Sequence, residues 1–235
     1  MKKLAAAFKF LTLWGCFSAP KPAQVSFGGA AVFFPLVGLL LGLLLALINY
    51  SLAAYVDPRI LNLFLIALLI GASGAWHLAG LKSTFDSIGA ASTDQVAPMT
   101  TALGITAVVL LLLFKNAALD SMDELLTLSL LLTPVLARWS LVIFLFDAHS
   151  RFSEDTRLIA GRVTLGEVFI GTAATLALVV YFLGRKGLWI ALGISLFSLS
   201  MRGLLIRRHS ELSHAHLGAA IEISETLSLV LLASL

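Results

Sequence analysis

The chain has 235 residues, of which 59% are apolar and only 12% are charged, a composition that excludes a soluble globular protein. The formal net charge is a modest +3, and the basic residues are dispersed through the chain, so we expect no nucleic-acid partner. A single cysteine, Cys16, excludes an intramolecular disulfide. We therefore expect an integral membrane protein that is in contact with the lipid bilayer.

Residues 1–18 are predicted to form an amphipathic helix that lies in the membrane interface. Lys2, Lys3 and Lys9 are interspersed with apolar residues, so charged groups can contact lipid headgroups while the apolar face enters the acyl boundary. Two prolines within residues 18–23 end this helix before the first long apolar stretch.

Seven apolar stretches follow, each close to the length of about 20 residues that a helix needs to cross a bilayer. Because backbone groups in hydrocarbon must satisfy their own hydrogen bonds, we expect each stretch to be a helix. The connecting loops are short, so residues 1–235 are predicted to form one all-α, polytopic membrane domain. The predicted spans are 30–54, 61–78, 102–118, 125–146, 165–183, 188–205 and 217–234.

The distribution of basic residues predicts the orientation of these spans. Eleven of the sixteen Lys and Arg residues lie in the N-terminal tail and in the loops after spans two, four and six. Four others, Lys115 among them, are assigned to the opposite side of the membrane. The positive-inside rule therefore predicts that the N-terminus is cytoplasmic and that the C-terminus is outside.

Charged residues inside the predicted spans are the first candidates for a functional site, because each costs about 2.5–3.5 kcal/mol at a helix centre. Glu222 and Glu225 share one helix face, Arg138 is the expected counter-ion, and His77 ends the second span on the same side. Two glutamates against one arginine leave a negative charge, which favours a bound cation or proton. A polar cavity that holds a cation or phosphate and a purely structural ion pair both remain open.

Two weaker patterns concern packing and metal binding. Glycines at small-residue spacing in the first two spans predict close helix packing at Gly38, Gly42, Gly71 and Gly74. His214 and His216 suggest a zinc site only weakly, because no cysteine lies near them in the sequence.

Four segments together resemble the cobalamin synthase family, also called adenosylcobinamide-GDP ribazoletransferase. Residues 34–42 match the first-span signature, and the pair Ala137-Arg138 falls where the family has a similar pair. The segment 217–225 matches the closing signature G-D-x-x-G-A-x-x-E-x-x-E. The loop motif H-L-D-G-L-x-D-T-x-D-G is matched by His77, Leu78, Gly80, Leu81, Thr84 and Asp86.

The resemblance implies a Mg²⁺-dependent transferase of the cell inner membrane. Enzymes of this family join adenosylcobinamide-GDP to α-ribazole or its phosphate and release GMP, late in cobalamin biosynthesis. By the same resemblance, Asp86 and His77 are catalytic and Asp86, Glu222 and Glu225 are metal ligands. Substrate binding is carried over to Arg138, Thr84, Gly80 and Gly218.

The chain departs from the family pattern at its aspartates. Ala79 and Ser83 replace two aspartates of the loop motif, and Ala215 replaces the aspartate of the closing signature. An alanine cannot ligate a metal, and serine is a poor ligand for Mg²⁺, which prefers carboxylate oxygens. We therefore expect a weak or inactive member of the family; Asp94 is one further carboxylate in the following loop.

Two alternatives remain. A non-catalytic paralogue would bind a corrinoid or nucleotide, as a homo-oligomer or as a subunit beside an active paralogue. A small transporter would use the cluster of Arg138, Glu222 and Glu225 instead.

Overall fold

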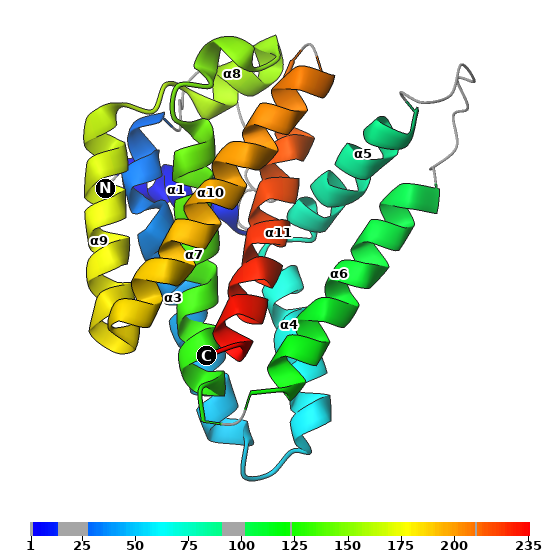
Figure 1. Cartoon of the computed structure of the whole chain (residues 1–235), viewed down its shortest axis with the longest axis vertical. Helices are drawn as coiled ribbons and strands as arrows, with labels where there is room; N and C mark the ends of the chain where they lie inside the picture. Colours follow the sequence, from blue (N-terminus) through cyan, green and yellow to red (C-terminus); the bar gives the residue numbers. More distant parts are fainter. Residues whose placement is uncertain (1, 14–27, 91–101, 123, 210) are drawn as a thin grey trace.

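A computed structural model describes residues 2–13, 28–90, 102–122, 124–209 and 211–235. Within these residues the fold is helical, and the only extended pairing is an isolated bridge between Phe152 and Leu212. Figure 1 labels the α-helices. In chain order the elements are α1 (Lys2–Leu11), η1 (Gly28–Phe33), α3 (Phe34–Leu52), α4 (Pro58–Ala72), α5 (Trp76–Ala90), α6 (Ala102–Asp120), α7 (Leu126–Leu145), η2 (His149–Arg151), α8 (Glu154–Ala160), α9 (Leu165–Leu183), α10 (Arg185–Arg208) and α11 (His214–Ala233).

Six of the described helices are long and apolar enough to cross a membrane, or seven if α4 and α5 are counted as one bent span. The prediction of an all-α, multi-pass membrane protein is therefore confirmed. Helices α7 and α11 are largely buried, whereas α9 exposes most of its surface. Side chains on exposed helices are apolar because their surroundings are hydrocarbon; Leu113 and Phe169 are two examples. No contact in the structure tests the predicted orientation of the N-terminus.

The prediction for the second span is wrong in its second half. Instead of one helix over 61–78 followed by a loop, the chain forms α4, turns by 85° and continues as α5. Gly74 and Ala75 make the turn, with φ angles of 63° and 59° in the left-handed region. The segment with the polar residues that suggested a loop is helical, and α5 packs against α11 and α6.

The glycine prediction is confirmed in α3 and wrong near the α4–α5 turn. A Cβ atom at Gly38 would collide with the backbone of Pro134 in α7, and one at Gly42 would collide with the backbone of Leu131. These glycines let α3 and α7 approach closely along their length. Gly71 has open space around it. Gly74 adopts the left-handed conformation that the turn requires and does not mediate a helix contact.

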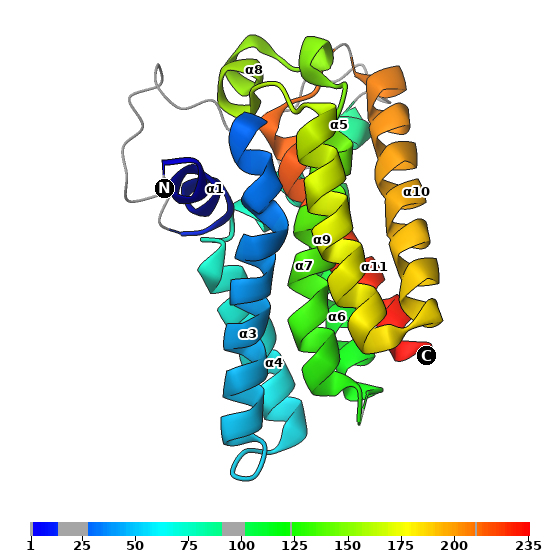
Figure 2. The ribbon, with the colours of Figure 1, turned by 90° about the vertical axis from the view of Figure 1, so that its left-hand side faces the viewer.

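Helix α1 covers part of the predicted N-terminal segment and packs on η1 and α3, across the long axis of the bundle (Figure 2). The amide of Leu13 donates to the carbonyl of Ala72 at 2.7 Å, at the end of α4. The ring of His214 makes edge contacts with Phe10 and with Trp76, so α1, α5 and α11 meet there. Residues 14–18 of the predicted helix lie outside the described residues, and its membrane depth stays a prediction.

Candidate functional site

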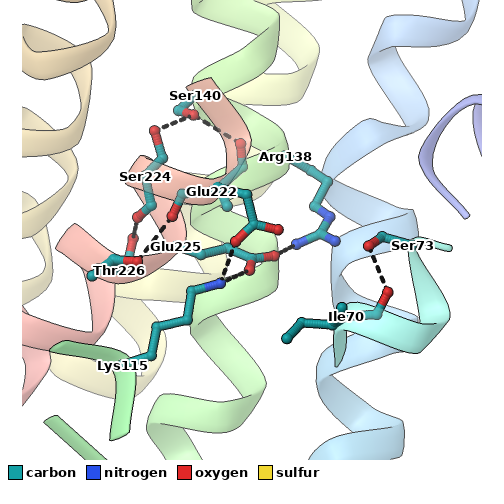
Figure 3. A network of polar contacts seen from close by, with 11 residues as sticks. Ile70, Ser73, Lys115, Arg138, Ser140, Glu222, Ser224, Glu225 and Thr226 are labelled. Atoms are coloured by element: carbon teal, nitrogen blue, oxygen red, sulfur yellow. Dashed lines mark hydrogen bonds and ion pairs between the residues drawn. The ribbon is translucent and has the colours of Figure 1, made fainter. Parts of the chain in front are cut away.

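A buried network of four charged side chains joins the three helices α6, α7 and α11. Lys115 donates to Glu222 at 2.6 Å and to Glu225 at 2.8 Å. Arg138 donates to the other oxygen of Glu225. Figure 3 shows these contacts. Each of the four side chains is at most 2% exposed. Two acids therefore face two bases, and the network is electrically balanced.

The expected pair of Arg138 with a glutamate is confirmed, but the expected excess of negative charge is wrong. The distribution of basic residues assigns Lys115 to the side of the membrane opposite the cytoplasm, and this assignment stays a prediction. Its side chain is 1% exposed and points into the bundle. Its ammonium supplies the second positive charge, so the glutamates need no extra cation for balance. A lone lysine within an apolar span is the signal that could have revealed it.

His77, Gly80 and Gly218 lie where α5 meets α11. A Cβ atom at Gly80 would approach the carbonyl oxygen of Ala215 to 2.7 Å, and one at Gly218 would approach Cα of His77 to 3.1 Å. Both glycines are therefore required for the close contact of the two backbones. Whether they also bind substrate stays a prediction. His77 is buried, and its electrostatic interactions reach Arg138, Glu225 and Lys115, so it lies beside the ion network.

Several buried polar atoms near this contact have no hydrogen-bond partner among the described residues. They are Nδ1 of His77, Oγ1 of Thr84, and Nε and Nη2 of Arg138. A buried polar group that stays unpaired costs free energy, and such groups concentrate at functional sites. The predicted site residues His77, Thr84 and Arg138 therefore retain hydrogen-bonding capacity inside the protein.

Asp86 lies apart from the glutamates. Its carboxylate pairs with Lys82 at 2.8 Å and accepts from the amide of Gly104 at 3.1 Å, in the first turn of α6. Gly104 and Lys115 are eleven positions apart on α6, so about 16 Å of helix separates Asp86 from the ion network. The structure therefore does not bring Asp86 together with Glu222 and Glu225.

The side chains described do not fit a magnesium ion as they are arranged. Within the described segments no group of three or more His, Cys, Asp or Glu residues could hold a metal. One oxygen of Glu222 and both oxygens of Glu225 and of Asp86 already accept hydrogen bonds from basic groups or from the backbone. Asp94 lies outside the described residues, and the magnesium site stays a prediction.

Two of the three replaced aspartate positions lie on one face of α5, together with the retained Asp86. Ala79, Ser83 and Asp86 are spaced i, i+4 and i+7, and both Ala79 and Ser83 are exposed. Ala215 lies in the first turn of α11, against the backbone of Gly80. The two motif segments are therefore adjacent, and carboxylates at 79, 83 and 215 would share one region of the surface.

Comparisons with known proteins agree with the motifs. The family described as cobalamin-5-phosphate synthase matches residues 3–233. A protein of Geotalea daltonii named adenosylcobinamide-GDP ribazoletransferase is 32% identical over 224 residues, which cover 88% of this chain and 87% of the relative. A protein of the same name from Thermoanaerobacter is 28% identical and covers 98% and 96% of the two chains.

A third relative of that name, from Pseudomonas fluorescens, is 29% identical and covers 91% of this chain and 90% of its own. No solved structure matches the chain. The family match extends from α1 to the end of α11 and includes the network of Lys115, Arg138, Glu222 and Glu225. The chain belongs to the cobalamin-5-phosphate synthase family, whose members are membrane-bound transferases of cobalamin biosynthesis.

Proposed function

We propose that the protein catalyses the transfer named for its relatives at a rate far below theirs. In that reaction a hydroxyl of α-ribazole displaces GMP from the phosphorus that carries adenosylcobinamide. The observation that carries the proposal is the surface formed by Ala79, Ser83 and Ala215, where the family pattern has aspartates. The scaffold that would position those carboxylates is intact, but the carboxylates are absent.

The side chains that remain can orient substrates. Arg138 keeps two unpartnered nitrogens, Nε and Nη2, and His77 keeps Nδ1 unpartnered, all buried beside the contact of α5 with α11. Guanidinium and imidazole groups bind phosphate oxygens or hydroxyl groups well when water is excluded. Asp86 offers a carboxylate at the surface of α5, where it is paired with Lys82. These groups support binding and orientation of the substrates, and the carboxylates that the family pattern has at positions 79, 83 and 215 are missing.

We place the substrate-binding face in the cytoplasm and the protein in the inner membrane. The eleven basic residues of the N-terminal tail and of the loops after spans two, four and six support this orientation. Fusions of a fluorescent protein and of alkaline phosphatase to the C-terminus test it. Phosphatase activity with no fluorescence is expected, and the reverse would overturn the orientation.

The activity is tested with the full-length protein in lipid nanodiscs, supplied with adenosylcobinamide-GDP, α-ribazole and Mg²⁺. We expect slow product formation that Asp86→Ala abolishes. The triple variant Ala79→Asp, Ser83→Asp, Ala215→Asp should raise the rate at least tenfold and should increase the affinity for Mg²⁺. The matched control replaces the same three positions with Asn, which has the size of Asp without its charge, and should not raise the rate.

Two outcomes would overturn the proposal. A wild-type rate equal to that of the Geotalea daltonii relative under the same conditions would contradict the low activity. No product from the wild type and from the aspartate triple variant would contradict the transferase itself and would favour a non-catalytic relative.

A further inference from the structure

A second polar cluster lies near the C-terminal end of α6, which packs against α4. The side-chain amide of Asn62 in α4 donates to Oδ1 of Asp120, the last residue of α6, at 2.7 Å. The amide of Asn116, one turn earlier in α6, donates to Oδ2 of the same carboxylate at 3.0 Å. Gly104, which binds Asp86, is sixteen positions before Asp120, so about 24 Å of helix lies between the two carboxylate contacts. The cluster is therefore far from Asp86, and it shares no residue with the ion network.

The hydrogen bonds of this cluster leave its amide oxygens unpartnered. Oδ1 of Asn62 and Oδ1 of Asn116 are both buried, and neither accepts a hydrogen bond from a described residue. Asn62 is only 3% exposed, within an apolar stretch of α4. A buried carboxamide oxygen without a partner costs free energy, whereas a leucine at the same place would not. The cluster therefore has room for a ligand that satisfies oxygen atoms.

The carboxylate of Asp120 has no basic partner among the described residues. The ion pairs that the structure describes involve Asp86, Glu222 and Glu225, and none of them involves Asp120. Asp120 ends α6, and the dipole of a helix is negative at its C-terminus. Glu124 follows four positions later in the chain and is exposed. The ligand that this place favours is therefore a cation.

We infer that Asn62, Asn116 and Asp120 bind a hard cation of the calcium type. A half-turn of each amide about its Cβ–Cγ bond exchanges its nitrogen with its oxygen and turns both amide oxygens toward the carboxylate. Four oxygens from three side chains then serve as ligands, and water completes the shell because Asp120 is exposed. Without the ion, the amides turn their N–H groups to the carboxylate, as the two hydrogen bonds show.

The chemistry of the ligands favours calcium over magnesium and zinc. Calcium takes about six to eight oxygen ligands, including carboxylate and asparagine oxygens, and it tolerates irregular geometry. Magnesium demands a nearly ideal octahedron and retains several waters, and zinc is bound mainly by imidazole nitrogen and thiolate sulfur, which these three side chains lack. Because the set contains one carboxylate, we expect weak binding, with Kd of about 10⁻⁴–10⁻³ M.

The test measures thermal unfolding of the full-length protein in nanodiscs of neutral lipid, after a chelator has removed divalent cations. Calcium chloride at about ten times Kd, with the ionic strength held constant, should raise the melting temperature by about 3 °C or more. Asp120→Asn preserves the size of the side chain and removes its charge, and it should reduce this shift at least fivefold. Glu124→Gln is the matched control, because it removes one negative charge from an exposed acid near the end of α6, and it should preserve the shift.

A third variant, Asn62→Leu, removes an amide ligand without a change in charge. Leucine suits the apolar helix α4, so the variant should fold. Equilibrium dialysis with radioactive calcium should show saturable binding of one ion per wild-type chain, and this binding should be lost in Asn62→Leu. Loss in this variant, which has the same net charge, separates a specific site from general attraction of cations.

Equal calcium shifts in the wild type and in Asp120→Asn would overturn the inference, as would the absence of saturable calcium binding to the wild type. Equal shifts with Mg²⁺ or Na⁺ at the same concentration would overturn the assignment to calcium. These measurements use neither substrate nor turnover, so their failure leaves the proposed transferase activity unaffected.

Discussion

Replacement of Lys115 by Met tests whether the buried ion network is the main polar element that holds the bundle together. Methionine has a similar length and volume, so the variant removes the charge with little change in packing. Lys115 is the only side-chain partner of Glu222 among the described residues, and it also binds one oxygen of Glu225. In Lys115→Met, two glutamates that are at most 2% exposed are left with Arg138 alone.

The expected loss of stability follows from this imbalance. Breaking a buried ion pair by removal of one partner costs about 3–5 kcal/mol, because the remaining charge is buried without compensation. Since each 1.4 kcal/mol is a factor of ten, the unfolding equilibrium should shift by about two to three and a half orders of magnitude. Lys186→Met, at an exposed lysine of α10, is the control and should change stability by less than about 0.5 kcal/mol.

The assay is reversible unfolding in mixed micelles with increasing denaturing detergent, monitored by helical circular dichroism. A second variant separates charge imbalance from lost packing. Adding Glu222→Gln to Lys115→Met removes the unpaired charge and should recover at least half of the lost stability. A loss below about 1 kcal/mol in Lys115→Met, or no recovery in the double variant, would refute the reasoning.

Two further predictions concern the backbone. Gly42→Val should destabilise the protein by about 1–3 kcal/mol or more, because a Cβ atom at Gly42 meets the backbone of Leu131. Gly71 has open space around it, so Gly71→Ala should be neutral or mildly stabilising in the same unfolding assay. Equal effects of the two changes would contradict the close contact of α3 with α7. Ala75→Gly should raise the melting temperature slightly, because φ of Ala75 is 59° and an alanine in the left-handed region costs about 1–2 kcal/mol. A lower melting temperature would contradict the strain assigned to Ala75 in the turn.

Much of the fold can be predicted from the sequence because membrane helices are local structures. Each long apolar stretch satisfies its own backbone hydrogen bonds, so its position does not depend on its neighbours. The predicted spans 102–118 and 165–183 coincide with α6 and α9 to within two residues at each end. The turn at Gly74 and Ala75 could not be predicted in this way. The apolar pattern continues through it, and only the packing of α5 on α11 and α6 shows that the chain changes direction.

The candidate site was predictable as a set of residues but not as an arrangement. Motif spacing singled out His77, Asp86 and the two glutamates without reference to the fold. Motif spacing could not show that Asp86 accepts a hydrogen bond from Gly104 in the first turn of α6. Gly104 lies about 16 Å along this helix from Lys115, which binds the glutamates. That separation depends on how α5 and α6 cross, which no local pattern encodes.

The sequence by itself determined that this protein is a bundle of membrane helices of one family, and that the family's aspartates are replaced at 79, 83 and 215. Only the tertiary structure decided which charges neutralise one another and which segments are adjacent. Lys115 and Glu222 are 107 positions apart, and their ion pair forms because α6 and α11 pack together in an interior that excludes water. Hydropathy is a property of each segment, whereas charge compensation is a property of the assembled bundle.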